Sequence, residues 1–213
     1  MAGARTLNGA LVPLKGTAPT NVNFQSTDYD RKTGLKGDGS TKYLDSNRAN
    51  NADPFDSKHI YTYLTETLTR GSGINNTPIG RSGTGGSFYL QAPAGMTQVA
   101  CNSASHVLVG NGAPYPIGGV GFSRSIVSGQ SATHIDYIFQ NDGSGYASVT
   151  ETGTIALAAN IAPVSTTIGV FGNTGYTYTD ARIPFYSIGE SIDLVNLNSR
   201  VSTLMTDLNI AIP

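Results

Sequence analysis

Hydrophobic and polar residues alternate along most of this chain with a period of two, which is the pattern of β-strands. The segment KHIYTYLTET, residues 58–67, shows it best, because Ile60, Thr62 and Leu64 alternate with tyrosine and threonine. Both sets of side chains are bulky and either β-branched or aromatic. We therefore expect a strand over residues 58–67 that is buried on both faces.

Similar short runs recur at hairpin-like spacing, separated by turns rich in Gly, Pro and Asn. The segment NDGSG, Asn141–Gly145, is the strongest hairpin signal, because its residues tolerate the positive φ of tight turns. We expect strands over residues 133–140 and 146–158 to pair across it. Further strands are predicted over residues 6–16, 87–92, 97–102, 106–111, 118–128, 165–173 and 181–189. About ten short strands of this kind predict an all-β protein, an antiparallel sandwich, with residues 1–213 forming a single domain.

The pattern changes after Ser191. Apolar residues then recur at positions 194, 197, 201, 204, 205 and 208, which is helical spacing. Ser191 suits the N-cap, and Asp193 would lie in the first turn, where the helix dipole favours a carboxylate. We expect an amphipathic helix over about residues 191–210 that lies against a sheet edge. The alternative is that its apolar face meets a partner subunit.

Composition excludes several classes of function. Charged residues make up 13% of the chain, and the net charge is -1. Nucleic-acid binders usually show a basic face, and peripheral membrane contacts are often polybasic, so we expect no nucleic-acid partner. No apolar run reaches the roughly 18 residues that a membrane span needs, so no membrane insertion is expected. The single cysteine, Cys101, excludes an internal disulfide.

The glycine-rich stretch GLKGDGSTKYLDSN, residues 34–47, resembles a ligand loop at first sight. A phosphate loop needs Gly-Lys-Ser/Thr entering a helix, whereas here Lys42 follows Ser40 and Thr41. A calcium loop of the EF-hand type fails too, because Ala49 occupies the third ligand position and no glycine follows it. Neither motif is therefore satisfied.

We interpret this stretch as a turn that feeds a strand beginning near Thr41. Gly37 and Gly39 permit positive φ, and the Asp38 side chain can bind its own backbone. A looser calcium site stays open as an alternative without a supporting motif. It would use Asp38, Asp45 or Asp53.

The sequence contains no pattern typical of a hydrolase. It has no Gly-x-Ser-x-Gly elbow, and its histidines, His59, His106 and His134, are too far apart in sequence for a zinc motif. A sandwich glycosidase needs two carboxyl groups about 5–9 Å apart. No predicted strand carries an acid-x-acid pair. We predict that the protein is not an enzyme, although carboxylates from different strands could still meet.

Tyrosines in loops are the best candidates for ligand contact. The chain has no Trp but 11 Tyr, and an amphipathic ring beside polar loop residues suits sugar binding. The alternative is that these tyrosines only fill β positions. The candidate ligand-binding residues are Tyr115, Asp142, Tyr146, Tyr176 and Tyr178.

Both ends of the chain resemble the laminin-G/concanavalin-A-like family. The stretch GLKGDGSTKYLDSN is similar to the opening strand pair of these domains, with Leu35, Asp38, Gly39, Tyr43 and Leu44 at matching positions. The closing ARIPFYSIGESIDLVNLNSRVSTLM is similar to their final strand and helix. With ARTLNGALVPL, the chain looks like the version of this domain found at the C-terminus of many tailed-phage structural proteins. Residues 133–175 depart from the family pattern.

This resemblance implies a concanavalin-A-like jelly-roll of two antiparallel sheets in a phage virion, on a tail fibre or tail tip. It implies attachment to a host cell-surface glycan, contact with other virion proteins, and a homo-oligomer, which would be a trimer as in fibre proteins. The calcium ligands of the family and the Glu-x-Asp-x-Glu motif of sandwich-fold glucanases have no secure match, so no cofactor is expected. The alternatives are a capsid-decoration protein without a ligand and a polysaccharide-degrading tail enzyme.

Overall fold

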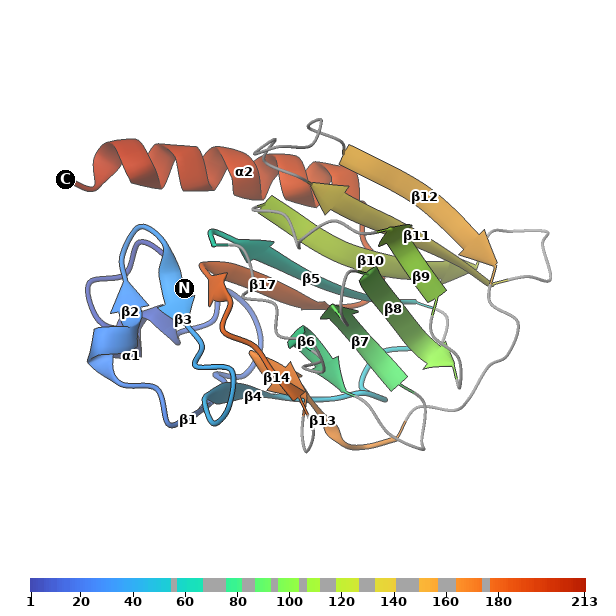
Figure 1. Ribbon diagram of the computed structural model, residues 1–213, viewed down its shortest axis with the longest axis horizontal. Helices are drawn as coiled ribbons and strands as arrows, with labels where there is room; N and C mark the ends of the chain where they lie inside the picture. The colour runs from blue at the N-terminus through green and yellow to red at the C-terminus, as the bar shows by residue number, and fades with distance from the viewer. Residues whose placement is uncertain are drawn as a thin grey trace.

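A computed structural model describes most of the chain and shows antiparallel sheets followed by one long helix (Figure 1). The described residues are 1–54, 57–66, 76–81, 87–92, 96–103, 107–111, 118–126, 133–140, 150–156, 164–173 and 177–213. All of the strand pairs in the described residues are antiparallel. The predicted all-β class is therefore confirmed.

Two larger sheets contain most of the strands. The seven-stranded sheet has the order β1 (Thr20–Val22), β4 (Tyr43–Ala49), β13 (Thr167–Val170), β6 (Asn76–Arg81), β7 (Ser87–Ala92), β8 (Met96–Ser103) and β9 (Val107–Asn111). The five-stranded sheet has the order β12 (Thr150–Ala156), β11 (Thr133–Gln140), β10 (Gly118–Ile126), β5 (Lys58–Leu64) and β17 (Phe185–Gly189). The hairpin partners predicted on either side of Asn141–Gly145 do pair, as β11 and β12.

The remaining elements are short, apart from the C-terminal helix. The pair β14 (Gly172–Asn173) and β15 (Thr177–Tyr178) forms one small sheet, and β16 (Arg182–Ile183), β3 (Gly34–Lys36) and β2 (Tyr29–Asp30) form another. The helices are α1 (Leu7–Ala10), a 3-10 turn at Ser26–Asp28, and α2 (Leu194–Ala211). Among the described residues, no helix combines the length and the apolar character that crossing a bilayer requires.

A hydrophobic core joins the two larger sheets. Leu44, Ile79 and Phe88 reach it from the seven-stranded sheet, and Ile60 and Leu64 reach it from β5. All five side chains are removed from water, which favours folding by roughly 1.5–3 kcal/mol for each side chain. This layering of two sheets agrees with a sandwich, while the jelly-roll connection stays a prediction.

Strand β5 is covered on both faces, as its sequence predicts. Ile60 and Leu64 point into the core between the sheets, whereas Tyr61 packs with Val201 and Met205 of α2 in a second core. The alternation of side chains along a strand places successive residues on opposite faces. β5 therefore forms the middle layer between the seven-stranded sheet and α2 (Figure 1).

The predicted C-terminal helix is present, but its start and its position differ from the prediction. Asp193, not Ser191, is the N-cap, and its carboxylate accepts a hydrogen bond from the Asn196 amide at 3.0 Å. Ser191 instead bonds the Ser57 hydroxyl at 2.9 Å, which holds it outside the helix. The helix lies on a face of the five-stranded sheet, against β10 and β11, and not against an edge.

The strand predicted over residues 6–16 is wrong. Residues Leu7–Ala10 form a helical turn, α1, whose N-cap Thr6 accepts a hydrogen bond from the Gly9 amide at 3.2 Å. Leu7 and Ala10 are both buried and lie three residues apart, which is the spacing of one helix face and not of one strand face. A capping threonine and this spacing favour a turn of helix.

The Gly-Asp-Gly turn is confirmed. Oδ1 of Asp38 accepts hydrogen bonds from the backbone amides of Ser40, Thr41 and Lys42 at 2.8–3.0 Å. Gly39 has a φ of 72°, in the region that favours glycine. The following strand begins at Tyr43. In this strand Leu44 is fully buried and Tyr43 is only partly buried.

Candidate functional site

A cleft opens between α2 and the end of β5, and we call it the α2 cleft. Its volume is about 250 Å³. Its lining combines one aromatic ring, one thioether, three threonines and one amide: Thr33, Tyr63, Thr65, Met205, Thr206 and Asn209. These residues come from a turn, a strand end and a helix that are far apart in sequence.

The end of β5 supplies one wall of the cleft. Tyr63 lies on the face of β5 that meets α2, because it is two residues beyond the buried Tyr61. Thr65 follows the strand, and its hydroxyl donates to the carbonyl oxygen of Thr33 at 2.7 Å. This bond ties the turn between β2 and β3 to the strand end, which brings Thr33 to the cleft.

Helix α2 supplies the opposite wall. Met205 is buried against the sheet, while Thr206 and Asn209 are exposed and three residues apart, so they share a helix face. The Thr206 hydroxyl donates to the carbonyl oxygen of Ser202 at 3.0 Å. Its oxygen lone pairs remain able to accept a hydrogen bond from a ligand.

The chemistry of this lining suits a neutral polyhydroxylated ligand. A sugar ring offers an apolar face for an aromatic side chain and hydroxyl groups for Thr and Asn. Of the six residues that line the cleft, none is acidic. The volume lies just below the roughly 300–1,000 Å³ of pockets for drug-sized ligands, so the cleft suits a single ring better than a long chain.

Sequence reasoning missed this cleft. Tyr63 was expected to be a strand residue with both faces buried, and it is indeed half-buried beside the second core. The only signal was polar Thr206 and Asn209 on a helix flank that borders apolar Met205. Thr33 lies far from this flank in the sequence, and only the folded chain brings the two to the same cleft.

The predicted ligand residues are only partly placed by the structure. Tyr178 lies in β15 beside Tyr43, with ring centroids 6.1 Å apart and both rings half-buried. It does not line the α2 cleft. The other predicted residues lie outside the described residues: Tyr115, Asp142, Tyr146 and Tyr176.

The three aspartates of the alternative calcium site each bind partners of their own. Burial acts to raise the pKa of Asp38, but hydrogen bonds from Thr41 and from nearby backbone amides outweigh it and hold that pKa well below the usual range. Asp45 accepts from the hydroxyl of Thr167 at 2.9 Å, and Asp53 pairs with Arg48. In the described part of the chain, no three His, Cys, Asp or Glu side chains gather as a metal would require.

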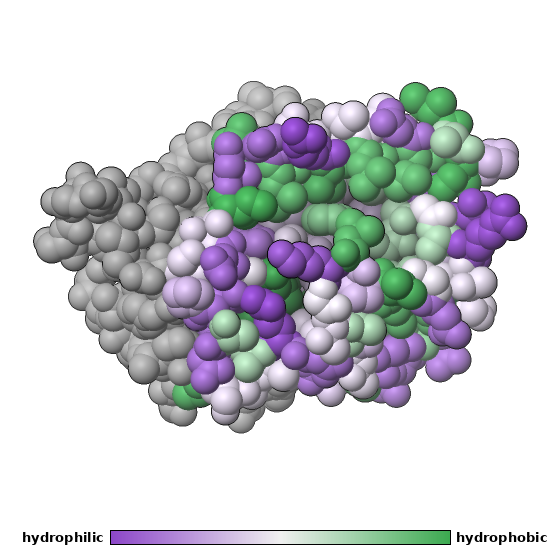
Figure 2. All heavy atoms as spheres, turned by 180° about the vertical axis from the view of Figure 1, so that it is seen from behind, coloured by the Kyte–Doolittle hydropathy of each residue, from purple (hydrophilic) through white to green (hydrophobic). Residues whose placement is uncertain are grey.

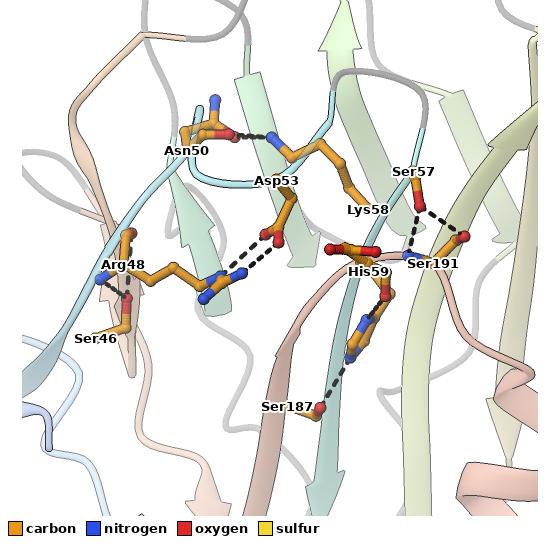
Figure 3. A network of polar contacts seen from close by, with 10 residues as sticks. Ser46, Arg48, Asn50, Asp53, Ser57, Lys58, His59, Ser187 and Ser191 are labelled. Atoms are coloured by element: carbon orange, nitrogen blue, oxygen red, sulfur yellow. Dashed lines mark hydrogen bonds and ion pairs between the residues drawn. The ribbon is translucent and has the colours of Figure 1, made fainter. Parts of the chain in front are cut away.

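A second polar cluster lies where β4 leads into β5, and we call it the β4–β5 corner (Figure 3). The Nε of Arg48 lies 2.9 Å from Oδ2 of Asp53, and a second bond completes a bidentate pair. Lys58 is fully buried, and its Nζ lies 2.7 Å from Oδ1 of Asn50. A buried lysine nitrogen needs hydrogen-bond partners, and Asn50 provides two oxygens for it.

His59 is also held in this corner. Its Nδ1 bonds the carbonyl oxygen of Glu190 and therefore carries the proton, and its Nε2 lies 2.8 Å from Oγ of Ser187. Burial lowers the pKa of His59, so the neutral ring is favoured. A Ser–His pair can begin a nucleophilic site, but here a backbone carbonyl orients the ring and only 5% of the residue is exposed. We therefore interpret the pair as structural.

No protein-family model matches the chain, and no curated protein matches it in sequence.

Proposed function

We propose that this protein is a non-enzymatic phage virion protein that binds a host cell-surface glycan, and that the α2 cleft takes one sugar ring of it. In this proposal Tyr63 provides the apolar surface. Thr33, Thr65, Thr206 and Asn209 provide hydrogen-bonding groups. The protein would stand on a tail fibre or tail tip, together with other virion proteins.

The observation that carries the glycan proposal is the lining of one cleft by Tyr63 and four polar, uncharged side chains. Hydrolysis of a glycosidic bond ordinarily needs two carboxyl groups beside the bond. The lining provides none, which favours binding over cleavage. Each hydrogen bond in such a site adds modest affinity, so we expect weak binding at one cleft that multiple copies would strengthen.

The virion part of the proposal rests on the resemblance of the two end motifs to concanavalin-A-like domains of phage structural proteins. The antiparallel sheets and the C-terminal helix are compatible with that resemblance. Mass spectrometry of purified phage particles that encode this chain would test it. Finding the chain in stoichiometric amounts supports the proposal, and finding it only in the lysate contradicts it.

A pair of matched variants tests the cleft. Thr203 and Thr206 both lie exposed on α2, and both hydroxyls donate to the backbone four residues earlier at 3.0 Å. Only Thr206 lines the cleft. On an array of bacterial surface oligosaccharides, we expect Thr206→Lys to lose the signal that wild-type protein gives and Thr203→Lys to keep it.

A structural role without a ligand is the second candidate, and the surface of α2 favours it. Leu204 is large, apolar and 43% exposed, and it shares one flank of α2 with the half-buried Leu197 and Leu208, seven residues before it and four after it. Figure 2 shows apolar side chains gathered in a band along the side of the molecule where α2 lies. Exposed apolar patches often mark contacts between proteins. A homo-oligomer, as expected for a fibre protein, would cover this surface.

A further inference from the structure

A lysine and an asparagine from the two larger sheets meet in the β4–β5 corner. Lys58 is the first residue of β5, and Asn50 directly follows β4. Nζ of Lys58 lies 2.7 Å from Oδ1 of Asn50 and also bonds the backbone carbonyl oxygen of the same residue. Figure 3 shows the two side chains pointing toward one another across the corner.

The surroundings of this pair exclude water and hold both partners in place. Both residues are fully buried. The backbone N–H of Asn50 donates to the carbonyl oxygen of Thr166 at 2.9 Å, which anchors the Asn50 backbone next to β13. Nζ of Lys58 lies 4.3 Å from the centre of the Phe88 ring. An amine and a side-chain amide are thus held together away from water.

We propose that Lys58 and Asn50 form an intramolecular isopeptide bond that ties the seven-stranded sheet to the five-stranded sheet. The bond would close the loop between β4 and β5 covalently at one corner of the two-sheet structure.

The reaction needs no oxidant, reductant or external reactant. Nζ of Lys58, as the neutral amine, attacks Cγ of Asn50, and a bond forms between Nζ and Cγ. One proton passes from Nζ to Nδ2, the bond between Cγ and Nδ2 breaks, and ammonia leaves. The product is a secondary amide. One amine and one primary amide are consumed, and one secondary amide and one ammonia are formed.

The corner favours this reaction in two ways. Removal from water disfavours the ammonium form of an amine, and only the neutral amine is a nucleophile. The fold also holds the two groups next to each other, so the reaction does not have to bring them together from solution. The amide must turn so that Cγ faces Nζ.

Asp53 has a supporting role in this arrangement. Both of its carboxylate oxygens are bonded by Arg48, which fixes Asp53 to the last part of β4. The Arg48–Asp53 pair therefore has a positioning role, three residues beyond Asn50.

Mass spectrometry of the denatured wild-type protein tests the proposal. Release of ammonia lowers the mass by about 17 Da. Trypsin cuts after Arg48 and Arg70 but not after a lysine in an isopeptide bond, so residues 49–70 should appear as one peptide with that mass loss. Separate peptides covering residues 49–58 and 59–70 at full mass would overturn the proposal.

Two variants distinguish the isopeptide from a succinimide at Asn50, which also loses ammonia. Lys58→Arg keeps a positive charge but cannot form this bond, so we expect the full mass. A loss of about 17 Da that persists in Lys58→Arg would mean a succinimide and would overturn the proposal. Asn50→Ser should likewise show the full mass. In the wild-type protein a succinimide would leave Lys58 open to trypsin, so the uncleaved peptide 49–70 separates the two products even if a variant fails to fold.

Discussion

The hydroxyl of Tyr61 donates a hydrogen bond to Oδ1 of Asn198 at 2.8 Å and joins the five-stranded sheet to α2. Gly119 of β10 lies beneath this contact. A Cβ atom at Gly119 would lie 1.8 Å from Oδ1 of Asn198 and 2.3 Å from the Tyr61 hydroxyl oxygen. The close approach of α2 to the sheet at Asn198 therefore requires that residue 119 has no side chain.

Gly119→Ala should therefore push α2 away from the sheet. We expect a loss of about 1–3 kcal/mol in the free energy of unfolding, as for other overpacked cores, measured by urea denaturation. Gly9→Ala is the matched control, because a Cβ there meets its nearest atom at 3.4 Å and alanine favours helix. Equal stability of the two variants would contradict this account of the α2 contact.

The C-terminal helix shows how far sequence patterns reach. The apolar spacing predicts a helix, and Leu194, Val201 and Met205 are indeed buried. The pattern could not choose between two capping residues, because Ser191 and Asp193 are both good N-caps and the choice depends on Ser57 in a distant segment. The pattern also could not predict that the helix packs on a face of the sheet and not along its edge. Helical spacing shows which side of the helix is apolar, but not which surface that side contacts.

Local chemistry was predictable where one segment contains all the partners. The Asp38 turn could be predicted from Gly-Asp-Gly, because the donors that bind the Asp38 carboxylate all lie within four residues of it in the sequence. The α2 cleft was not predictable, because Thr33, Tyr63 and Thr206 meet only in the folded chain. The segment after Thr6 was assigned to the wrong element, because a single turn of helix is too short to show a clear period.

The Asp38 turn predicts a stability difference that depends on pH. Asp38→Ala removes one acceptor side chain that binds three backbone amides, and we expect a loss of about 1 kcal/mol at pH 7, as for a helix cap. The pKa of Asp38 is lowered in the fold, so this stabilisation is present above pH about 4 and is lost as the pH falls toward the lowered pKa.

Urea denaturation at pH 7 and pH 3 measures this effect. Asp207→Ala is the control, since Asp207 is an exposed aspartate on α2, away from the turn. The gap between wild type and Asp38→Ala should narrow at pH 3. A gap that stays constant with pH would show that the carboxylate charge does not stabilise the turn.

His59 predicts acid sensitivity. Burial lowers its pKa in the fold, so the unfolded chain takes up a proton near pH 6.5 while the folded chain does not. The free energy of unfolding should therefore be greatest above pH about 6.5 and should fall as the pH drops toward the lowered pKa.

His59→Gln removes this titration, and the comparison is made by urea denaturation between pH 5 and pH 8. The nearby charges are Asp53, which favours the imidazolium, and Arg48, which opposes it. We expect wild type to lose more stability than His59→Gln over that range. The same pH dependence in both proteins would refute the role of His59.

The flank of α2 that carries Leu197, Leu204 and Leu208 predicts self-association. Leu204→Glu should leave the free energy of unfolding nearly unchanged, because Leu204 is an exposed residue. In analytical ultracentrifugation the same substitution should shift the protein from oligomer toward monomer. Thr203→Glu adds the same charge to the neighbouring position and should leave the oligomer intact. A wild-type protein that sediments as a monomer at all concentrations would exclude this surface as a self-association site.

The most direct test of the glycan proposal is an NMR titration of the wild-type protein with an oligosaccharide taken from the surface-array screen. The account predicts shift changes concentrated at Tyr63, Thr65, Thr206 and Asn209, with binding weakened at least tenfold by Thr206→Lys and unchanged by Thr203→Lys. A tenfold loss corresponds to about 1.4 kcal/mol of binding free energy. Binding that leaves these four residues unperturbed, or the absence of any binding oligosaccharide, would contradict the proposed site.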